Sequence, residues 1–126
     1  MLSAAPTNAQ TVKPLDVLGI NLYVQKVSFG GSAAGKLATE RLIENDPFGV
    51  AVVGIEDDGK ISFFCKVGPE ALKLGAHAGN LVREVAKVAG GGGGGSPTFA
   101  QAGGKGIERI DEALASAEKF LTLQKN

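Results

Sequence analysis

Two glycine-rich segments contain the residue types that can bind an anion. One of them, Ala102-Gly103-Gly104-Lys105-Gly106, follows a short strand-like stretch and precedes a helical pattern that begins near Ile107. At the start of a helix, unpaired N–H groups and the positive end of the helix dipole favour negative charge. Because a lysine stands in the same turn, we expect an anion-binding point at Lys105.

The other segment runs from Gly90 to Gly95 and ends in Ser96. It follows the C-terminal end of a predicted helix, where the partial negative charge repels phosphate. On that helix Asn80, Arg83 and Lys87 are spaced i, i+3 and i+7, so they form one polar stripe that leads to the glycines. Two interpretations stay open. The stripe helps to bind a polyanion, or Lys87 only complements the dipole and Arg83 is a solvated surface charge.

The glycine run itself is either a slack linker or a place where the backbone comes very close to something. Ordering a residue costs about 1–2 kcal/mol, and glycine has the most freedom to lose. The segment after the run, with about 30 residues, is too short to bury a core of its own. We therefore expect a shaped loop within one domain.

A third segment, Gly30 to Lys36, comes close to the phosphate-binding pattern G-x-x-x-x-G-K-[ST]. Leu37 stands where that pattern needs a hydroxyl to hold magnesium, and it fits the apolar face of a helix instead. A nucleotide-binding enzyme built on Gly30 to Lys36 is therefore a remote alternative.

The chain offers few groups for catalysis. His77 is the only histidine and Cys65 the only cysteine, so neither a histidine-based triad nor a zinc site can be assembled from them. We expect His77 to be a packing or helix-start residue and Cys65 to be buried. The sequence predicts no catalytic residue, no metal site and no cofactor.

Bulk properties agree with one globular domain. The chain has 126 residues, 44% of them hydrophobic, and 13 basic residues balance 13 acidic ones. A balanced chain has no global field that attracts nucleic acid or an anionic membrane, so such binding needs a local patch. No apolar run is long enough to span a membrane, and the N-terminus lacks the features of a secretory signal. We expect a cytoplasmic protein that does not bind membranes.

The hydropathy pattern predicts a loose lead-in over residues 1–14 and one domain over 15–126. The order of elements is strand, helix, strand, strand, helix, glycine loop, strand and helix, with a tight hairpin turn at 57–60. This order predicts an α/β or α+β fold, with a mixed sheet of about four strands packed against three helices. The expected strands are 20–27, 50–55, 60–67 and 98–102, and the expected helices are 32–45, 75–89 and 107–121.

The segment from Ala78 to Lys105 resembles a known family. Its Ala-Gly helix, its glycine run followed by Ser96-Pro97, and Ala-Gln-Ala-Gly-Gly at 100–104 are similar to the C-terminal, DHH-associated domain of alanyl-tRNA synthetase. Gly92 stands where the family usually has lysine, Ser96 where it has arginine, and Thr98 where it has an acid. The resemblance therefore implies that the backbone of the loop is kept while two positive charges are lost.

The resemblance implies a non-catalytic module that grips the outer corner of tRNA(Ala) and helps to couple aminoacylation to editing. The parent protein would be an alanine–tRNA ligase that uses ATP, magnesium and zinc in other domains. The expected partners are tRNA(Ala) and the catalytic and editing domains of that enzyme, and a homodimerisation or scaffold domain is the alternative. The residues expected to bind RNA are Asn80, Arg83, Lys87, Gly90, Gly91, Gly92, Gly93, Gly94, Gly95, Ser96, Gln101, Gly103, Gly104 and Lys105.

Overall fold

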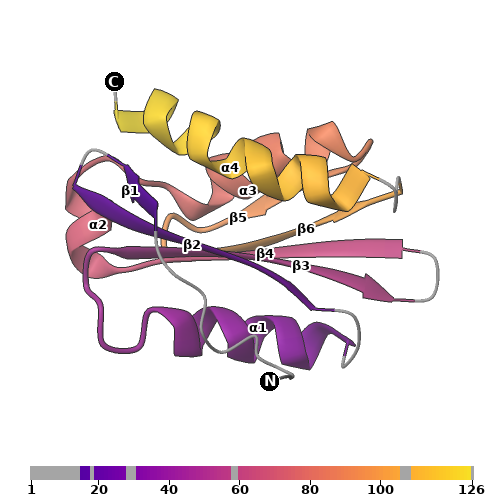
Figure 1. Cartoon of the computed structure of the whole chain (residues 1–126), viewed down its shortest axis with the longest axis horizontal. Coiled ribbons are helices and arrows are strands. Elements are labelled where there is room, and N and C mark those ends of the chain that lie inside the picture. The colour runs from indigo at the N-terminus through magenta and orange to yellow at the C-terminus, as the bar shows by residue number, and fades with distance from the viewer. Residues whose placement is uncertain (1–14, 18, 28–30, 58–59, 106–108, 126) are drawn as a thin grey trace, which may run out of the picture.

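A mixed sheet lies between two layers of helices in the computed structural model of the chain (Figure 1). The structure describes residues 15–17, 19–27, 31–57, 60–105 and 109–125. The lead-in expected over 1–14 and the turn residues Asp58 and Gly59 lie outside these ranges. Helix α1 lies on one face of the sheet, and α3 and α4 lie on the other (Figure 1).

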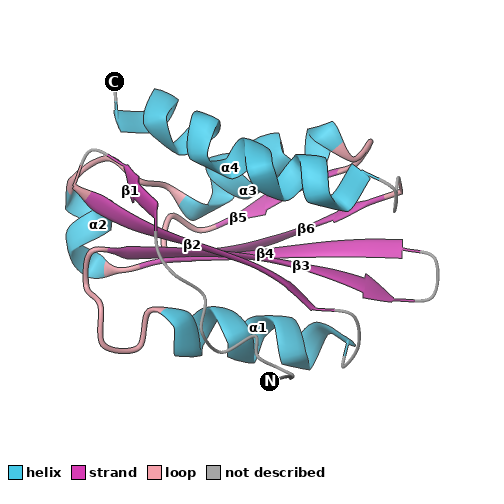
Figure 2. Cartoon of the chain, in the orientation of Figure 1, coloured by secondary structure: helices cyan, strands magenta, loops and turns pink. Residues whose placement is uncertain are grey.

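The sheet has six strands in the order β1-β2-β3-β4-β6-β5 (Figure 2). The pair β2 and β3 is parallel, and every other neighbouring pair is antiparallel. The parallel pair is possible because α1 connects β2 to β3 across one face. The strands are β1 (Leu15–Val17), β2 (Ile20–Val27), β3 (Gly49–Asp57), β4 (Lys60–Val67), β5 (Gly92–Gly95) and β6 (Phe99–Gly104). The helices are α1 (Gly31–Leu42), α2 (Pro69–Lys73), α3 (Ala78–Val88) and α4 (Ile110–Lys125).

The predicted fold class is confirmed, and the element counts are larger than expected. The four predicted strands correspond to β2, β3, β4 and β6, and the three predicted helices to α1, α3 and α4. The additional elements are the short strand β1, the single-turn helix α2, and β5, which consists of four glycines. None of these three shows a hydropathy period, because each is too short or has no side chains.

The core lies mainly between the sheet and the helices α3 and α4. Alternation along β4 directs Ile61, Phe63 and Cys65 into this core, while Phe64 faces α1. The prediction that β3 is buried on both faces is also confirmed, because Val52 and Val53 are both fully buried. The buried side chains on β3 and β4 therefore join both helix layers to one sheet.

Helix α1 differs from the sequence-based expectation at Leu37, which is 47% exposed rather than part of the buried face. The helix packs on the sheet through Gly35 instead, where any Cβ would overlap the ring of Phe64. The chain is helical from Gly31 onward, so residues 31–36 form no phosphate-binding loop; Gly30 lies outside the described ranges. Packing against Phe64 explains Gly35 without a nucleotide.

The glycine run forms an edge strand where a loop was expected. A Cβ on Gly93 would lie 2.5 Å from Cα of Ala102, and one on Gly91 would overlap the carbonyl oxygen of Gly103. From the helix side, a Cβ on Gly79 would lie 2.7 Å from the carbonyl oxygen of Gly95. The glycine backbone therefore does come very close to something, as expected, and that neighbour is the backbone of β6 and α3.

The loop between α1 and β3 is held by the carboxylate of Asp46. Its Oδ2 accepts hydrogen bonds from the Tyr23 hydroxyl at 2.7 Å and from Asn21 Nδ2 at 3.0 Å, and its Oδ1 accepts one from Phe48 N at 3.0 Å. The bond to the carboxylate, aided by desolvation, raises the pKa of Tyr23 to about 12. Asp46 thus links β2 to the residues that begin β3.

We expect substitutions in the glycine run to differ sharply by position. Gly91→Ala and Gly93→Ala should each lower the free energy of unfolding by roughly 1–3 kcal/mol, because the new methyl group pushes β5 away from β6. Gly92→Ala is the matched control, since a Cβ there meets nothing within 4 Å. It should be neutral or stabilise the fold by up to about 1 kcal/mol. Urea unfolding measures all three, and equal losses would contradict the strand pairing.

The pH titration of Tyr23 tests the Asp46 network directly. Tyr23 is the only tyrosine and the chain has no tryptophan, so ultraviolet absorbance of phenolate reports this residue alone. We expect a midpoint near 12 in the native protein, and a value closer to the ordinary ~10 in Asp46→Asn. The folded state favours the protonated phenol. The stabilisation is therefore complete below pH ~10 and is lost as the pH rises through about 12. An ordinary midpoint in the native protein would mean that the Tyr23–Asp46 bond does not form.

Candidate nucleic-acid interface

The glycine strand β5 forms one edge of the sheet. All four of its residues are exposed, and it pairs on one side only, with β6, so that Gly94 lies opposite Gln101. The turn from β5 to β6 is closed by Ser96, whose Oγ accepts from Phe99 N at 3.1 Å and whose N donates to Phe99 O at 3.1 Å. Here Ser96 has a structural role, and the exposed edge beside it presents backbone polar groups with no side chain in front of them.

Helix α3 ends at this strand in a tightly bonded cap. Gly90, at φ +76°, donates to Lys87 O, and Gly91 donates to Ala86 O. This is the Schellman arrangement of a helix C-terminus. Lys105 N donates to Ala89 O at 3.0 Å. The carbonyl groups that would repel a phosphate at this end are therefore largely occupied by N–H donors.

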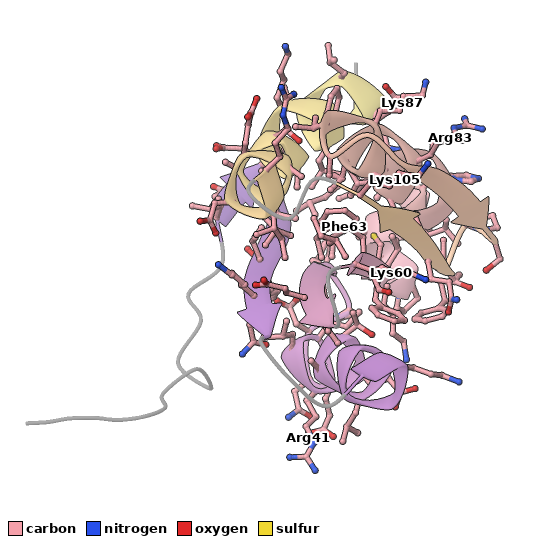
Figure 3. The ribbon with its side chains drawn as sticks, turned by 90° about the vertical axis from the view of Figure 1, so that its right-hand side faces the viewer. Arg41, Lys60, Phe63, Arg83, Lys87 and Lys105 are labelled. Atoms are coloured by element: carbon pink, nitrogen blue, oxygen red, sulfur yellow. The ribbon has the colours of Figure 1, made fainter. Side chains whose placement is uncertain are left out.

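Three cationic side chains surround an open hollow beside this cap. Lys87, Lys105 and Arg109 line it together with Val88, Ala89 and Gly90, and its volume is about 380 Å³. Figure 3 shows Lys87, Arg83 and Lys105 on the same side of the molecule, and Arg41 at the opposite end on α1. The structure thus brings together residues from α3, the end of β6 and the start of α4.

Arg109 was missed by the sequence analysis. Its spacing of four residues from Lys105 was the available signal, but helical periodicity alone could not show that both residues line one hollow with Lys87. Their position around the hollow depends on how α4 packs against α3, which is a tertiary property.

The polar stripe on α3 is present but has partners of its own. Arg83 Nη2 donates to Asn80 Oδ1 at 2.8 Å, and Lys87 Nζ lies 3.1 Å from Glu84 Oε2. Arg83 and Lys87 are both exposed, and contacts between exposed side chains are weak, so either cation can exchange its partner for an external anion. Lys87 therefore belongs both to an i, i+3 ion pair and to the hollow.

The structure describes only part of the expected anion site at the start of the last helix. Helix α4 is described from Ile110, and residues 106–108, near which the helix was expected to begin, lie outside the described ranges. The N–H of Lys105 is already donated to Ala89 O, and the first turn of α4 carries Asp111 and Glu112. The part of the predicted site that the structure describes is the exposed lysine side chain at the rim of the hollow.

The two residues that were considered for catalysis have structural positions. His77 caps α3, because its Nδ1 accepts from Asn80 N at 3.1 Å, as expected for a helix-start residue. Cys65 is fully buried, and burial raises the pKa of its thiol, which leaves it unreactive. In the described part of the chain, no three His, Cys, Asp or Glu side chains are grouped as metal ligands. Among the described helices, none is long and apolar enough to pass through a membrane.

Comparison with known proteins identifies the family and the fold. The DHHA1 domain family matches residues 19–123. The alanine–tRNA ligase of Alkaliphilus oremlandii is 49% identical over 108 residues, which cover 86% of this chain and 12% of that protein. The alanine–tRNA ligase of Oceanobacillus iheyensis is 35% identical over 124 residues, which cover 95% of this chain and 14% of that protein. The chain thus spans about an eighth of the length of these relatives.

A solved structure shares the fold. The C-Ala domain from Aquifex aeolicus alanyl-tRNA synthetase superposes with a TM-score of 0.79 and 26% sequence identity, covering 87% of this chain and 98% of that domain. The family match covers most of the chain, and the structural match covers nearly the whole of the other domain. The chain therefore belongs to the DHHA1 domain family, and it resembles the C-Ala domain of alanyl-tRNA synthetases.

Proposed function

We propose that this chain is a tRNA-binding module of an alanine–tRNA ligase, acting in the cytoplasm. It holds the outer corner of tRNA(Ala) and helps to couple aminoacylation to editing in the catalytic and editing domains of that enzyme. The module itself carries out no chemistry. ATP, magnesium and zinc are used, on this proposal, by the other domains.

The observation that carries the proposal is the hollow at the end of α3. Lys87, Lys105 and Arg109 converge there, and the exposed backbone of β5 lies beside them. Folded RNA is recognised mainly through its shape, its phosphates and its 2′-hydroxyl groups. Cations suit the phosphates, and a strand without side chains lets ribose groups approach the backbone closely.

Charge reversal at the hollow tests the proposal. Lys105→Glu should weaken binding of tRNA(Ala) and reduce the slope of log K against log salt by about one unit, because one phosphate contact is lost. The side chain lies beside the C-terminal end of α3, so the acid should also cost about 0.3–1 kcal/mol of stability. Filter-binding titrations at several salt concentrations give the slope, and thermal unfolding gives the stability.

Two further variants serve as a negative control and as a test in the opposite direction. Arg41→Glu makes the same charge change at the opposite end of the molecule (Figure 3) and should leave the slope unchanged. Gly92→Lys adds a charge where a Cβ meets nothing within 4 Å, and it should raise the affinity and the slope. Equal losses from Lys105→Glu and Arg41→Glu would mean that only total charge matters, and the hollow would no longer be a specific site.

Dimerisation is the second candidate function, and the free edge of β5 favours it. An unpaired edge strand can add a strand from a second copy, and four glycines offer no side chain to prevent it. Light scattering over a range of micromolar concentrations separates the two functions. A dimer that dissociates on dilution supports self-association, and a monomer at every concentration excludes it.

A further inference from the structure

The face of the sheet that carries α1 is only partly covered. Among the described residues, α1 packs against β2, β3 and β4, and no helix lies over β6 and β5 on that side (Figure 1). Side chains alternate along β4 and β6, and the residues between the following ones belong to the main core. The residues on the face that carries α1 are therefore Ser62 and Lys66 of β4, and Phe99 and Gln101 of β6. An open platform therefore extends from the side of α1 to the glycine edge.

The platform is positively charged although the whole chain is neutral. Strands β4, β5 and β6 contain no acidic residue, and their only charged residues are Lys60 and Lys66. Both lie on the same face as Ser62, since they are separated from it by an even number of positions. Lys66 forms no ion pair with any side chain that the structure describes, and Lys60 lies opposite Asp57 in the β3–β4 register.

Helix α1 adds a third lysine to the same platform. Lys36 reaches over the ring of Phe99, with Nζ 5.8 Å from the ring centroid. Phe99 is also the partner of Lys66 in the β4–β6 register. The half-buried ring thus has one lysine above it and another beside it. A base can stack on the ring once the exposed Lys36 side chain turns from the ring to a phosphate.

The rest of the platform has almost no side chains. Gly103 lies between Ser62 of β4 and Gly92 of β5 in the register, and Gly94 lies beside Gln101. From Lys60 to Lys66 the strand extends roughly 20 Å, at ~3.4 Å per residue. This length exceeds a single phosphate or a mononucleotide, so the lysines match an extended polyanion.

We propose that this platform binds an RNA strand, with phosphates on Lys36, Lys60 and Lys66 and the nucleotides over Phe99 and the glycine backbone. The inference rests on the proposed function, because it takes tRNA as the partner, and it extends the contact around the edge of β5 to a second face. RNA fits better than an acidic peptide because the platform combines cations with an aromatic ring and an accessible glycine backbone. None of Lys36, Lys60, Lys66 and Phe99 belongs to the hollow at α3.

Protection of an introduced thiol tests the location. Cys65 is buried, so alkylation of Ser62→Cys by iodoacetamide reports the platform with no background from the native cysteine. We expect tRNA(Ala) to slow this alkylation in proportion to the fraction of protein bound. Free alkylation of Ser62→Cys in a saturated complex would overturn the inference.

Salt dependence tests the lysines. Lys36→Gln and Lys60→Gln change exposed side chains, and each should reduce the slope of log K against log salt by about 0.7, as for a phosphate contact on a single strand. Arg41→Gln is the matched control and should leave the slope unchanged. Glu40→Gln should strengthen binding, because Glu40 lies one helical turn after Lys36 on the same side of α1.

The outcomes separate the two proposals. If the double variant Lys36→Gln/Lys60→Gln keeps the native slope of log K against log salt while Lys105→Glu weakens binding, the platform is excluded as an RNA site. The hollow then stands as the binding site. If the native protein does not bind tRNA(Ala) even at low salt, both proposals fail. If polyglutamate displaces the RNA from the platform as well as unlabelled tRNA does, the preference for RNA is overturned.

Discussion

Three segments of backbone, in β5, β6 and α3, pack against one another at one edge of the sheet so closely that a side chain between them would clash. Strand β5 lies against β6 through Gly93 and against α3 through the contact between Gly95 and Gly79. This approach determines the path of the chain, because α3 leads into β5 with only Gly90 and Gly91 beyond its cap. The same approach brings the end of β6 under the end of α3, where Lys105 N reaches Ala89 O. The cationic hollow exists because these backbones are so close.

Charge is distributed unevenly over a chain whose total is zero. The 13 basic and 13 acidic residues cancel in number, yet β4, β5 and β6 contain no acid at all. Acids gather elsewhere, for example at Asp111 and Glu112 in the first turn of α4, where they complement the helix dipole. A field strong enough for an anion is therefore local, within about a Debye length of the lysines.

The sequence predicts those parts of the fold whose residues have a period. Strand 20–27 alternates because one face is more deeply buried, and the helix with Leu81 and Val85 shows the helical period for the same reason. The glycine strand has no such signal, since a residue without a side chain has no buried or exposed face. Its state is decided by β6 and α3, which supply the contacts, and so it was expected to be a loop.

The sequence identified most residues of the candidate site, but it predicted less of how they are arranged in space. The glycine segments and Lys105 were identified because few residue types bind anions. Helix α4 is described from Ile110, with residues 106–108 outside the described ranges, and the N–H of Lys105 donates to the end of α3, which the sequence did not indicate. Leu37 and Arg109 show the same limitation, because burial and convergence on one point both depend on the packing of distant elements.

A strand made only of glycine has no side-chain pattern that specifies its pairing register, because every residue is identical to the next. Side-chain pattern normally specifies which residues face each other, so β5 must be positioned from its two ends. At one end Gly91 is bonded to Ala86, and at the other Ser96 and Pro97 accept hydrogen bonds from Gly79 and Ala78. The number of glycines between these two anchors must therefore match the fixed distance between them. A gene that gained or lost one glycine codon in this repeat would encode a strand that can neither slide nor close without disturbing an anchor.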